Sequence, residues 1–448
     1  MTNRRSFLRS AAIASAPLVL PAGVLGQKGR PGANDRLQVG FVGAGQRARW
    51  LMQYFGKEVP EAEIVAVADC YLPRCSGVDA GFPPTVSPMP ANFERWGKYQ
   101  NYLEMFEKEK LDAVFIETTT HARVLAAMHA MQAGLDVYAE KPISLTIHEG
   151  RTLVNAARKW NRILQAGSQQ RSIPIDRYAS ELVRSGKIGK IRAAVVCNYL
   201  PPMDWKPQPE QPVPEGMDWD RWCNQTEFRP YHPQLHRRWH KWWDYDDGGE
   251  SWGVSGWGTH GLDQVQCALG TDDTGPVELW TEDRHTDDSP DFVKLIEDDM
   301  KYTLARKPVI MRYASGTLLK LEEPGKTGLS QLGATFIGEN GTIKIERGDY
   351  TADPPELRKG APPVTPLGRG EDAFHLKNFI ECVRTRKKPN ADVEIGHRAT
   401  SLCHLVSITR KLDRKLRWDP KGEVFLGDRE ANQLLSRPRR KGYELPKA

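Results

Sequence analysis

The sequence predicts an α/β Rossmann domain followed by an α+β domain with an open, mostly antiparallel sheet. In residues 35–167, short apolar runs alternate with longer segments of helical periodicity, a pattern typical of a parallel sheet with crossover helices. After residue 191 the apolar runs lengthen and alternate with polar residues, which favours antiparallel strands. A chain of 448 residues is too long for one ordinary core, so we expect two domains and a separate N-terminal segment.

The predicted elements follow this division. Parallel strands are expected at residues 37–42, 64–68, 113–116, 137–139 and 163–166, and helices at 99–109, 121–133 and 146–160. The second half should contain strands at 191–199, 277–281, 299–304 and 309–313, a hairpin of 334–338 with 342–346, and helices at 372–387 and 396–414. Asn340-Gly341 supplies the positive φ that the hairpin's tight turn needs. We expect a signal and linker at 1–34, the Rossmann domain at 35–170, and the second domain with its C-terminal helices at 171–448.

The first thirty residues have the pattern of a twin-arginine export signal. The motif RRSFLR at residues 4–9 precedes a short apolar run at 11–20, and Ala16 and Gly26 are both candidate cleavage points. No segment approaches the ~20 apolar residues that a membrane span needs. We therefore expect an exported or periplasmic protein without a stable membrane span. Because this pathway carries folded proteins, a cofactor can be loaded before export.

The charge distribution gives no sign of nucleic-acid binding, and the cysteine spacing gives no sign of a disulfide framework or a zinc knuckle. The net charge of +6 arises from 63 basic and 57 acidic residues spread along the chain, apart from a basic stretch at 437–441, so nucleic-acid binding is not implied. The seven cysteines are scattered, with only Cys70 and Cys75 near each other. Neither a disulfide framework nor a zinc knuckle follows from this spacing.

A dinucleotide fingerprint follows the first predicted strand. It reads Gly43-Ala44-Gly45-Gln46-Arg47-Ala48, with alanine in the third glycine position. Gly43 allows the tight turn, Gly45 lets the backbone approach a pyrophosphate, and Ala48 packs the helix on the strand. The helix N-terminus then faces the phosphates. Residues 43–47 are therefore candidate cofactor contacts.

Asp69 ends the second predicted strand, where a carboxylate can accept hydrogen bonds from the adenosine ribose hydroxyls. An acidic group there repels a 2′-phosphate, so NAD is favoured over NADP. Arg74, five residues on, keeps NADP open as an alternative.

Lys141 is a candidate catalytic residue. Glu140-Lys141-Pro142 follows the strand at 137–139, at the sheet edge where α/β proteins bind ligands. Burial beside a nicotinamide can lower the pKa of this lysine and make it a proton acceptor or donor. The alternative is an exposed lysine before a proline turn.

A glycine-rich stretch at 248–261 enters a helix expected at about Leu262, and places His260 and Asp263 on one helix face. His260 can move a proton near neutral pH, and Asp263 can orient it or hold a substrate hydroxyl. The alternative is a histidine at a helix start that bonds to backbone.

The segment 231–243 is rich in aromatic and imidazole groups. His232, His236 and His240 are four apart, but no cysteine or carboxylate cluster completes a metal site, so we expect none. Sugar rings stack their C–H faces on indole, so the tryptophans favour a sugar-like ligand, with core packing as the alternative. Tyr231 and Trp243 are the candidate substrate contacts.

Together these residues resemble the glucose–fructose oxidoreductase, inositol dehydrogenase and MocA family, over essentially all of the chain after residue 35. The supporting motifs are VGFVGAG at 39–45, TTTH at 118–121, AGLDVYAEKP at 133–142 and QAGSQQR at 165–171. Glu-Lys-Pro is the most specific of them. The tail motifs NADVEIGHR at 390–398 and RWDP at 417–420 are similar to an exported branch of environmental bacteria.

The resemblance implies a substrate pocket on the antiparallel sheet and a homodimer or homotetramer. It implies that Lys141 contacts nicotinamide and substrate and that His260 is the acid/base. It also adds candidate contacts, to the cofactor from Thr118, Thr119, His121 and Glu140, and to the substrate from Arg171.

The chain departs from the family pattern at three positions. The aspartate that many members carry four residues before the histidine is Gly256 here, and the proline and second histidine after the fourth strand are Thr119 and Arg123. The sequence around His260 resembles NAD-dependent glycosidases of the same superfamily.

Three functions are open from these residues. The first, which we favour, is a dehydrogenase for a sugar, cyclitol or glycoside: Lys141 or His260 takes a hydroxyl proton while hydride passes to NAD(P). The second is a redox-neutral glycosidase or lyase, in which transient oxidation acidifies a neighbouring C–H and the hydride later returns; a recycled cofactor suits export. The third is a non-catalytic ligand-binding protein, which the presence of the cofactor and acid/base residues argues against.

Overall fold

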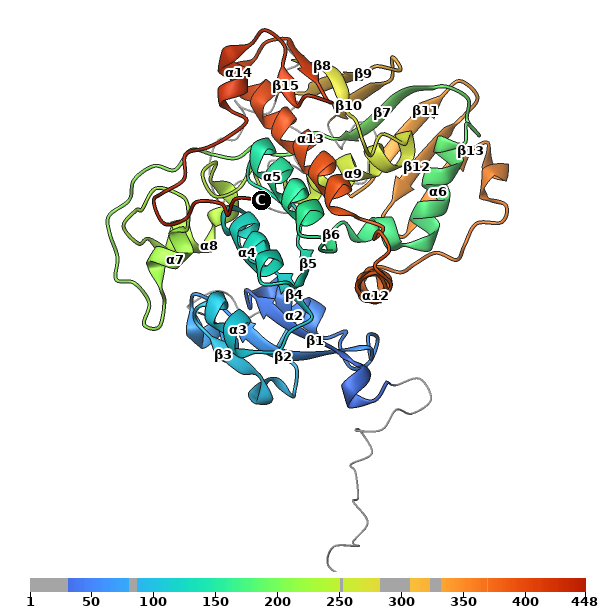
Figure 1. The fold of residues 1–448 in the computed structure, drawn as a ribbon. Coiled ribbons are helices and arrows are strands. Elements are labelled where there is room, and N and C mark those ends of the chain that lie inside the picture. The colour runs from blue at the N-terminus through green and yellow to red at the C-terminus, as the bar shows by residue number, and fades with distance from the viewer. Residues whose placement is uncertain (1–30, 80–86, 250–252, 283–306, 323–331, 369) are drawn as a thin grey trace, which may run out of the picture.

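The computed structural model describes residues 31–79, 87–249, 253–282, 307–322, 332–368 and 370–448 (Figure 1). The predicted export signal falls on residues 1–30, and the predicted strand 299–304 also lies outside the described residues. Among the described residues, no helix is long and apolar enough to cross a membrane.

The N-terminal half forms a six-stranded parallel sheet of order β3-β2-β1-β4-β5-β6. Its strands are β1 (Leu37–Val42), β2 (Ala62–Ala68), β3 (Gly97–Tyr99), β4 (Ala113–Ile116), β5 (Asp136–Ala139) and β6 (Leu164–Ala166). The helices between them are α2 (Gln46–Met52), α3 (Tyr102–Lys108), α4 (Thr120–Gln132) and α5 (Ile147–Lys159). This strand order is that of a dinucleotide-binding Rossmann domain, as the alternation predicts.

One helix from the second half of the chain completes the Rossmann core. Helix α12 (Glu371–Thr385) packs on the same sheet face as α2. The ring of Phe379 lies 5.5 Å from that of Phe115 on β4 and 5.8 Å from that of Tyr138 on β5. The N-terminal sheet is therefore partly covered by a helix that begins more than 200 positions after its last strand.

Within the described ranges the second sheet has nine strands in the order β13-β12-β11-β7-β10-β9-β8-β14-β15, antiparallel except for the parallel pair β7–β10. The strands are β7 (Ile191–Cys197), β8 (Pro276–Thr281), β9 (Val309–Tyr313), β10 (Leu318–Glu322), β11 (Ala334–Gly338), β12 (Thr342–Glu346), β13 (Asp349–Asp353), β14 (Leu416–Asp419) and β15 (Val424–Phe425). The predicted hairpin is β11 with β12.

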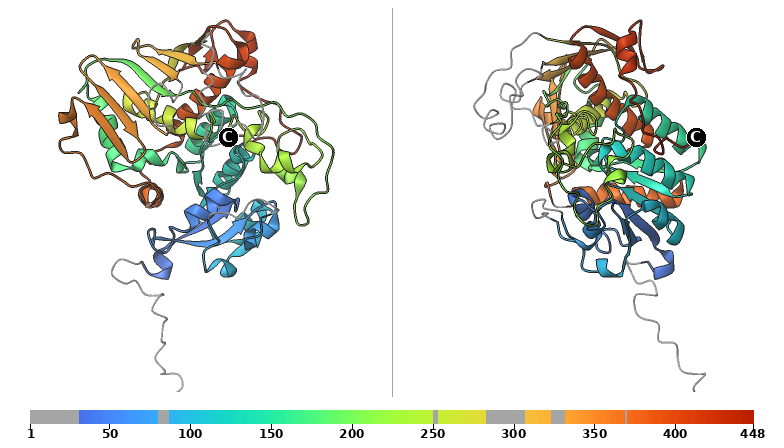
Figure 2. Two further views of the ribbon diagram at one scale, coloured as in Figure 1. Left: turned by 180° about the vertical axis from the view of Figure 1, so that it is seen from behind. Right: turned by 90° about the vertical axis from the view of Figure 1, so that its left-hand side faces the viewer.

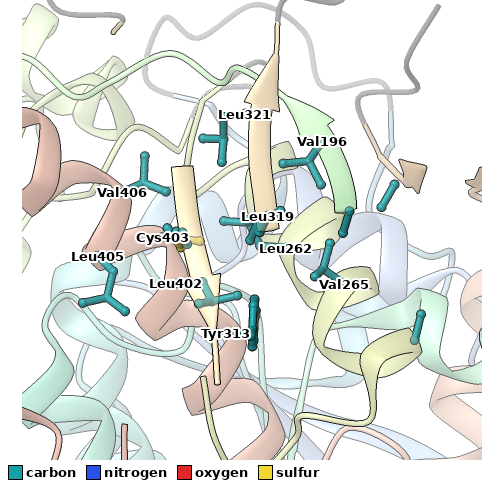
Figure 3. Packing of buried hydrophobic residues seen from close by; sticks show 14 of the residues in the cluster. Val196, Leu262, Val265, Tyr313, Leu319, Leu321, Leu402, Cys403, Leu405 and Val406 are labelled. Atoms are coloured by element: carbon teal, nitrogen blue, oxygen red, sulfur yellow. The ribbon is translucent and has the colours of Figure 1, made fainter. Parts of the chain in front are cut away.

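Helices cover this sheet and form the largest core. They are α6 (Pro174–Arg184), α9 (Trp257–Leu269) and α13 (Val393–Leu412), and a short α14 (Arg429–Gln433) follows β15. Leu262 of α9 and Leu402 of α13 pack together with Leu319 of β10 (Figure 3). Helix α9 packs in this core and also contacts Gln169–Ser172, which follow the last strand of the Rossmann sheet, so it connects the two domains.

Between β7 and α9 the chain leaves the sheet and forms a separate lobe, residues 198–249, which we call the aromatic lobe. It contains α7 (Trp219–Cys223) and α8 (Pro233–Arg237) and is drawn in green to yellow-green beside α4 (Figures 1 and 2). Its core is a cluster of buried rings, with Trp219 and Trp222 stacked at 4.4 Å between centroids.

Several element boundaries differ from the prediction by a few residues, including those of the helices predicted at 99–109 and at about Leu262. Residues 97–99 form the edge strand β3, so α3 begins at Tyr102. Helix α9 begins at Trp257 rather than at about Leu262, because the sheet and α13 pack against residues that the glycine-rich pattern made look like loop. His260 therefore lies within the first turn of α9.

Candidate active site

The carboxyl ends of the parallel strands open onto a cleft of about 1060 Å³ between the Rossmann domain and the second domain. The glycine turn, the end of β2, the turn after β4 and Lys141 line one wall. The other wall comes from the aromatic lobe, from the start of α9 and from residues near α12. The predicted contacts that line it are Gly43, Gly45, Gln46, Arg47, Asp69, Thr118, Thr119 and Lys141.

The glycine turn has the geometry that the fingerprint requires. Gly43 has φ +95°, and its N–H donates to the Ala68 carbonyl at 2.7 Å. A Cβ there would lie 2.7 Å from the Glu117 carbonyl oxygen, so only glycine fits. Gly45 precedes α2, and a Cβ built on it meets nothing within 4 Å. Its backbone thus leaves room for a pyrophosphate.

Asp69 organises this turn. Its carboxylate accepts the backbone N–H of Ala44 and that of Tyr71, both at 2.9 Å. A carboxylate has more lone pairs than these two donors use, so it can still accept ribose hydroxyls. Arg74 lies 3.6 Å from Asp69 and 3.8 Å from Asp79, so its charge is balanced by two acids rather than kept for a 2′-phosphate.

Arg47 and Glu140 hold the cleft floor together. Arg47 donates to Glu140 at 2.8 Å and, with both terminal nitrogens, to Asp372 of α12 at 3.1 and 2.9 Å. Glu140 also accepts the amide of Gln169 at 2.9 Å and does not line the cleft. Glu140 therefore braces the cleft floor: its Oε1 accepts from both Arg47 and Gln169, and its Oε2 accepts the backbone N–H of Lys141 at 3.0 Å.

Lys141 reaches from the end of β5 to the start of α9. Its Nζ donates to the Gly256 carbonyl at 2.7 Å. Burial lowers the pKa of Lys141 to about 8, although the nearby Glu140 and Asp246 carboxylates oppose the shift. Gly256 therefore accepts a hydrogen bond from Lys141 through its backbone carbonyl, where an aspartate at this position would offer a side-chain carboxylate.

His260 is placed near Lys141 but does not line the cleft. It is 5% exposed, and its Nδ1 is buried without a hydrogen-bond partner. Burial, followed by the charge of Lys141, holds the pKa of His260 well below its usual range. The ring is therefore neutral at physiological pH, while its neighbours Gly256 and Trp257 line the cleft.

Arg171 and Asp263 are brought together, but away from the cleft. The Arg171 Nε donates to both carboxylate oxygens of Asp263 at 2.8 and 2.9 Å, and its terminal nitrogens reach Asp272 at 3.0 and 2.7 Å. Both residues are almost fully buried. In this structure the two predicted substrate contacts form an ion pair inside the second domain and do not line the cleft.

Tyr231 and Trp243 also point elsewhere. Tyr231 is buried in the aromatic lobe, edge-on to Trp219 with 4.9 Å between ring centroids. Trp243 lies between two cations, 4.3 Å from the Arg437 guanidinium and 4.7 Å from the Lys411 amine. Neither residue lines the cleft. Tyr231 packs within the lobe, and Trp243 packs against the C-terminal tail. The tryptophans that do line the cleft are Trp50, Trp222, Trp239 and Trp257.

His121 is likewise not at the cofactor cleft. Its Nε2 lies 2.7 Å from the Trp222 carbonyl oxygen, and its ring is edge-on to Tyr245. Burial lowers the pKa of His121 to about 4, so the neutral ring donates to that carbonyl. In this structure His121 attaches the aromatic lobe to α4.

Glu117 is a cleft residue that the sequence reasoning missed. Both of its carboxylate oxygens, and the hydroxyl of Thr118 beside it, are buried without hydrogen-bond partners. Burial and the charge of Glu140 raise the pKa of Glu117 well above its usual range. Orphaned polar atoms at the end of β4 fit a bound dinucleotide that would satisfy them. The sequence signal that could have identified Glu117 is an acidic residue directly after a fully buried strand.

Arg123, at the position of the family's second histidine, positions the lysine loop. Its terminal nitrogens donate to the carbonyls of Thr118 and Pro142, so it ties the turn after β4 to the residue that follows Lys141. Its side chain is buried, and burial lowers its pKa.

No metal site emerges from the described part of the chain: no three histidine, cysteine, aspartate or glutamate side chains there are grouped to hold an ion. His236 of the predicted histidine series is 1% exposed and packs edge-on to Trp222.

Comparison with known proteins matches two family models in succession. Residues 37–168 match the NAD-binding Rossmann fold of an oxidoreductase family, and residues 181–445 match that family's C-terminal alpha/beta domain. The orphaned polar atoms and the open space at Gly45 agree with an NAD site at this cleft.

Individual relatives are distant. A glycosyl hydrolase family 109 protein of Shewanella pealeana is 28% identical over 173 residues, 35% of this chain and 37% of its own. A 1,5-anhydro-D-fructose reductase of Ensifer adhaerens is 32% identical over 101 residues, 22% of this chain and 30% of its own. The chain thus spans about a third of each relative's length.

Among solved structures, the WlbA dehydrogenase of Bordetella pertussis, in complex with NADH and UDP-GlcNAcA, superposes with a TM-score of 0.56. It is 16% identical and covers 86% of this chain and 99% of its own, a likeness of fold. Because the two family models together span both domains, the chain belongs to the glucose–fructose oxidoreductase, inositol dehydrogenase and MocA family of oxidoreductases.

Proposed function

We propose that the protein is an NAD-dependent oxidoreductase that acts on a hydroxyl of a sugar, cyclitol or glycoside. The observation that carries the proposal is Lys141: it lies in the same cleft as the glycine turn, it is partly buried, and its pKa is about 8. A lysine that is partly neutral near physiological pH, at the carboxyl edge of a dinucleotide-binding sheet, is equipped to take a proton.

The chemistry needs a hydride acceptor and a proton acceptor. Bound NAD⁺ supplies the first by taking a hydride from the carbinol carbon. The substrate hydroxyl must then lose its proton, and the neutral Nζ of Lys141 takes it. At a pKa of about 8, roughly a tenth of the lysine is neutral at pH 7. The Gly256 carbonyl, 2.7 Å away, holds the amine in place in either charge state.

His260 is proposed as the second proton carrier. A neutral imidazole with an unpartnered Nδ1 can accept a proton, and the positive charge of Lys141 lowers its pKa. When Lys141 is neutral, the contribution of its charge to the low pKa of His260 is lost. His260 is therefore proposed to take up a proton only while the lysine is neutral.

The second-domain wall supports a sugar-like substrate. Trp239 and Trp257 line the cleft and offer aromatic faces on which sugar C–H groups stack. Arg347, which lies 3.6 Å from Asp372, adds hydrogen-bond donors for hydroxyl groups. The similarity to a 1,5-anhydro-D-fructose reductase and to a dehydrogenase in complex with UDP-GlcNAcA supports this class of substrate.

A second candidate is a redox-neutral glycosidase or lyase that reduces and reoxidises its own NAD. Similarity to the glycosyl hydrolase family 109 protein favours it. So does Gly256, because no carboxylate at that position helps to hold the substrate hydroxyl.

We further propose export through the twin-arginine signal at residues 1–34, selection of NAD over NADP by Asp69, and assembly as a homo-oligomer. Loading the cofactor before export would suit a protein that works where NAD is scarce.

The test uses purified protein and a panel of sugars, cyclitols and glycosides. Lys141→Ala and His260→Ala should each lower turnover by at least ~100-fold while NAD still binds, because a general acid/base contributes about that much. Lys187→Ala, an exposed lysine on the second domain, is the matched control. Full activity in both variants would exclude these residues as catalysts.

The same panel separates the two candidates. A dehydrogenase without a recycling partner stops after one turnover and accumulates reduced nicotinamide. A redox-neutral enzyme continues on a glycoside without added NAD. Multiple turnovers without added cofactor would contradict the dehydrogenase, and a stoichiometric halt would contradict the redox-neutral enzyme.

A further inference from the structure

We propose that the aromatic lobe and the C-terminal tail complete the adenosine half of the cofactor cleft, and that they retain the dinucleotide between turnovers. The inference rests on NAD binding at this cleft but not on the reaction performed there. It concerns second-domain residues that the dinucleotide fingerprint does not include.

The lobe docks directly beside the ribose-binding carboxylate. The N–H of Leu72 donates to the Gly216 carbonyl at 3.1 Å, and the N–H of Asp218 donates to the Cys70 carbonyl at 2.8 Å. The side-chain amide of Gln100 bonds to both of these carbonyls, at 2.9 and 3.1 Å. Residues immediately after Asp69 are therefore joined to the lobe by main-chain hydrogen bonds.

A second attachment joins the lobe to the start of α4. The Thr120 hydroxyl donates to Asp246 at 3.1 Å, and the N–H of His121 donates to the Tyr245 carbonyl at 3.2 Å. The His121 ring adds its bond to the Trp222 carbonyl. The lobe thus spans from the end of β2, on the adenosine side of the sheet edge, to the turn after β4, just past the point between β1 and β4 where the strand order reverses.

The C-terminal tail holds the lobe in this position. Arg440 donates to the Asn224 carbonyl at 3.0 and 3.1 Å and pairs with Asp220. The Tyr443 hydroxyl donates to the same Asp220 at 2.5 Å. Arg439 pairs with Glu149 on α5 of the Rossmann domain. The C-terminal stretch 437–443, which we call the strap, therefore joins the lobe to the Rossmann domain, so its basic residues at 437–441 are more than a solvated patch.

Lobe and strap contribute directly to the cleft. Arg221, Trp222, Asn224 and Tyr443 line the same cleft as Gly43 and Asp69. A dinucleotide bound there would have the Rossmann sheet on one side and these residues on the other. Its departure would require the strap or the lobe to move, so dissociation should be slow.

The test measures dissociation of the dinucleotide from the full-length protein. The protein is loaded with NADH and chased with excess NAD⁺, and the loss of bound-NADH fluorescence gives the off-rate. Arg440→Ala should raise it roughly tenfold or more, since each lost charge-assisted hydrogen bond is worth about that factor. Lys441→Ala removes an exposed positive charge from the same strap and should leave the off-rate unchanged. Equal off-rates in all three proteins would overturn the proposal.

A second measurement does not depend on the folding of a variant. Hydrogen–deuterium exchange of the wild-type protein should show that NADH slows exchange of amides at 214–225, in the lobe, as well as those of the glycine turn. Protection confined to the Rossmann domain would overturn the proposal. Tyr443→Phe, which keeps the ring and loses only the bond to Asp220, should give a smaller rise in off-rate than Arg440→Ala. None of these readouts requires substrate, so they stand apart from the turnover assay.

Discussion

Lys141 should titrate near pH 8, and its titration can be measured without knowing the substrate. Burial is the largest influence and lowers the pKa, as do the charges of Arg47 and Arg123, while Glu140 and Asp246 raise it. The neutral form therefore appears as the pH rises through about 8, rather than through the ordinary value of 10.5.

The magnitude follows from the neutral fraction. With a pKa of about 8, the free amine should increase about fivefold from pH 7 to 8 and less than about twofold from pH 8 to 9. With an ordinary pKa it would increase about tenfold in each step. Competitive acetylation, followed by mass spectrometry of the peptide that contains Lys141, measures this fraction, with the exposed Lys187 as an internal reference.

Two variants should shift the curve in opposite directions. Gly256→Asp would place a carboxylate roughly 5 Å from the Lys141 amine. At an effective dielectric of 20 the attraction between the two charges is about 3 kcal/mol, which should raise the pKa of Lys141 by about 2 units. Glu140→Gln removes a carboxylate that raises the pKa, so the curve should move downward. An acetylation midpoint above about pH 9.5 in the wild type, or a midpoint that neither variant shifts, would refute the inference that the surroundings of Lys141 lower its pKa.

Three further predictions concern other parts of the molecule. Asp69→Ala should weaken NAD binding about tenfold or more and NADP binding much less, because only the unphosphorylated ribose uses the carboxylate. Titration followed by intrinsic fluorescence measures both affinities, and equal losses would contradict NAD selection. Arg171→Ala should lower the free energy of unfolding in urea by ~3–5 kcal/mol, since it leaves Asp263 buried without its cation; a change in substrate KM with normal stability would instead favour the original substrate role. Replacing Arg4 and Arg5 with lysines should trap the precursor in the cytoplasm, as cell fractionation would show; continued delivery of mature protein would mean that the signal was misread.

Local patterns in the sequence were enough to predict much of the cofactor wall. An apolar strand followed by Gly43-Ala44-Gly45, an acid at the end of β2 and a lysine after β5 are each placed by a strand's end, and the carboxyl ends of parallel strands meet at one edge. The hairpin around Asn340-Gly341 was equally local, because the turn residues themselves dictate its backbone.

The tertiary structure alone decided which polar side chains face the cleft. Arg171 and Asp263 look like site residues by type, yet they pair with each other, and His121 bonds to the lobe. Glu117 lines the cleft although no motif includes it. Spacing in sequence specifies a side chain's position along an element, but its partner comes from packing between segments far apart in the chain. The covering of the Rossmann sheet by α12, and of the cleft by the lobe and strap, has the same origin.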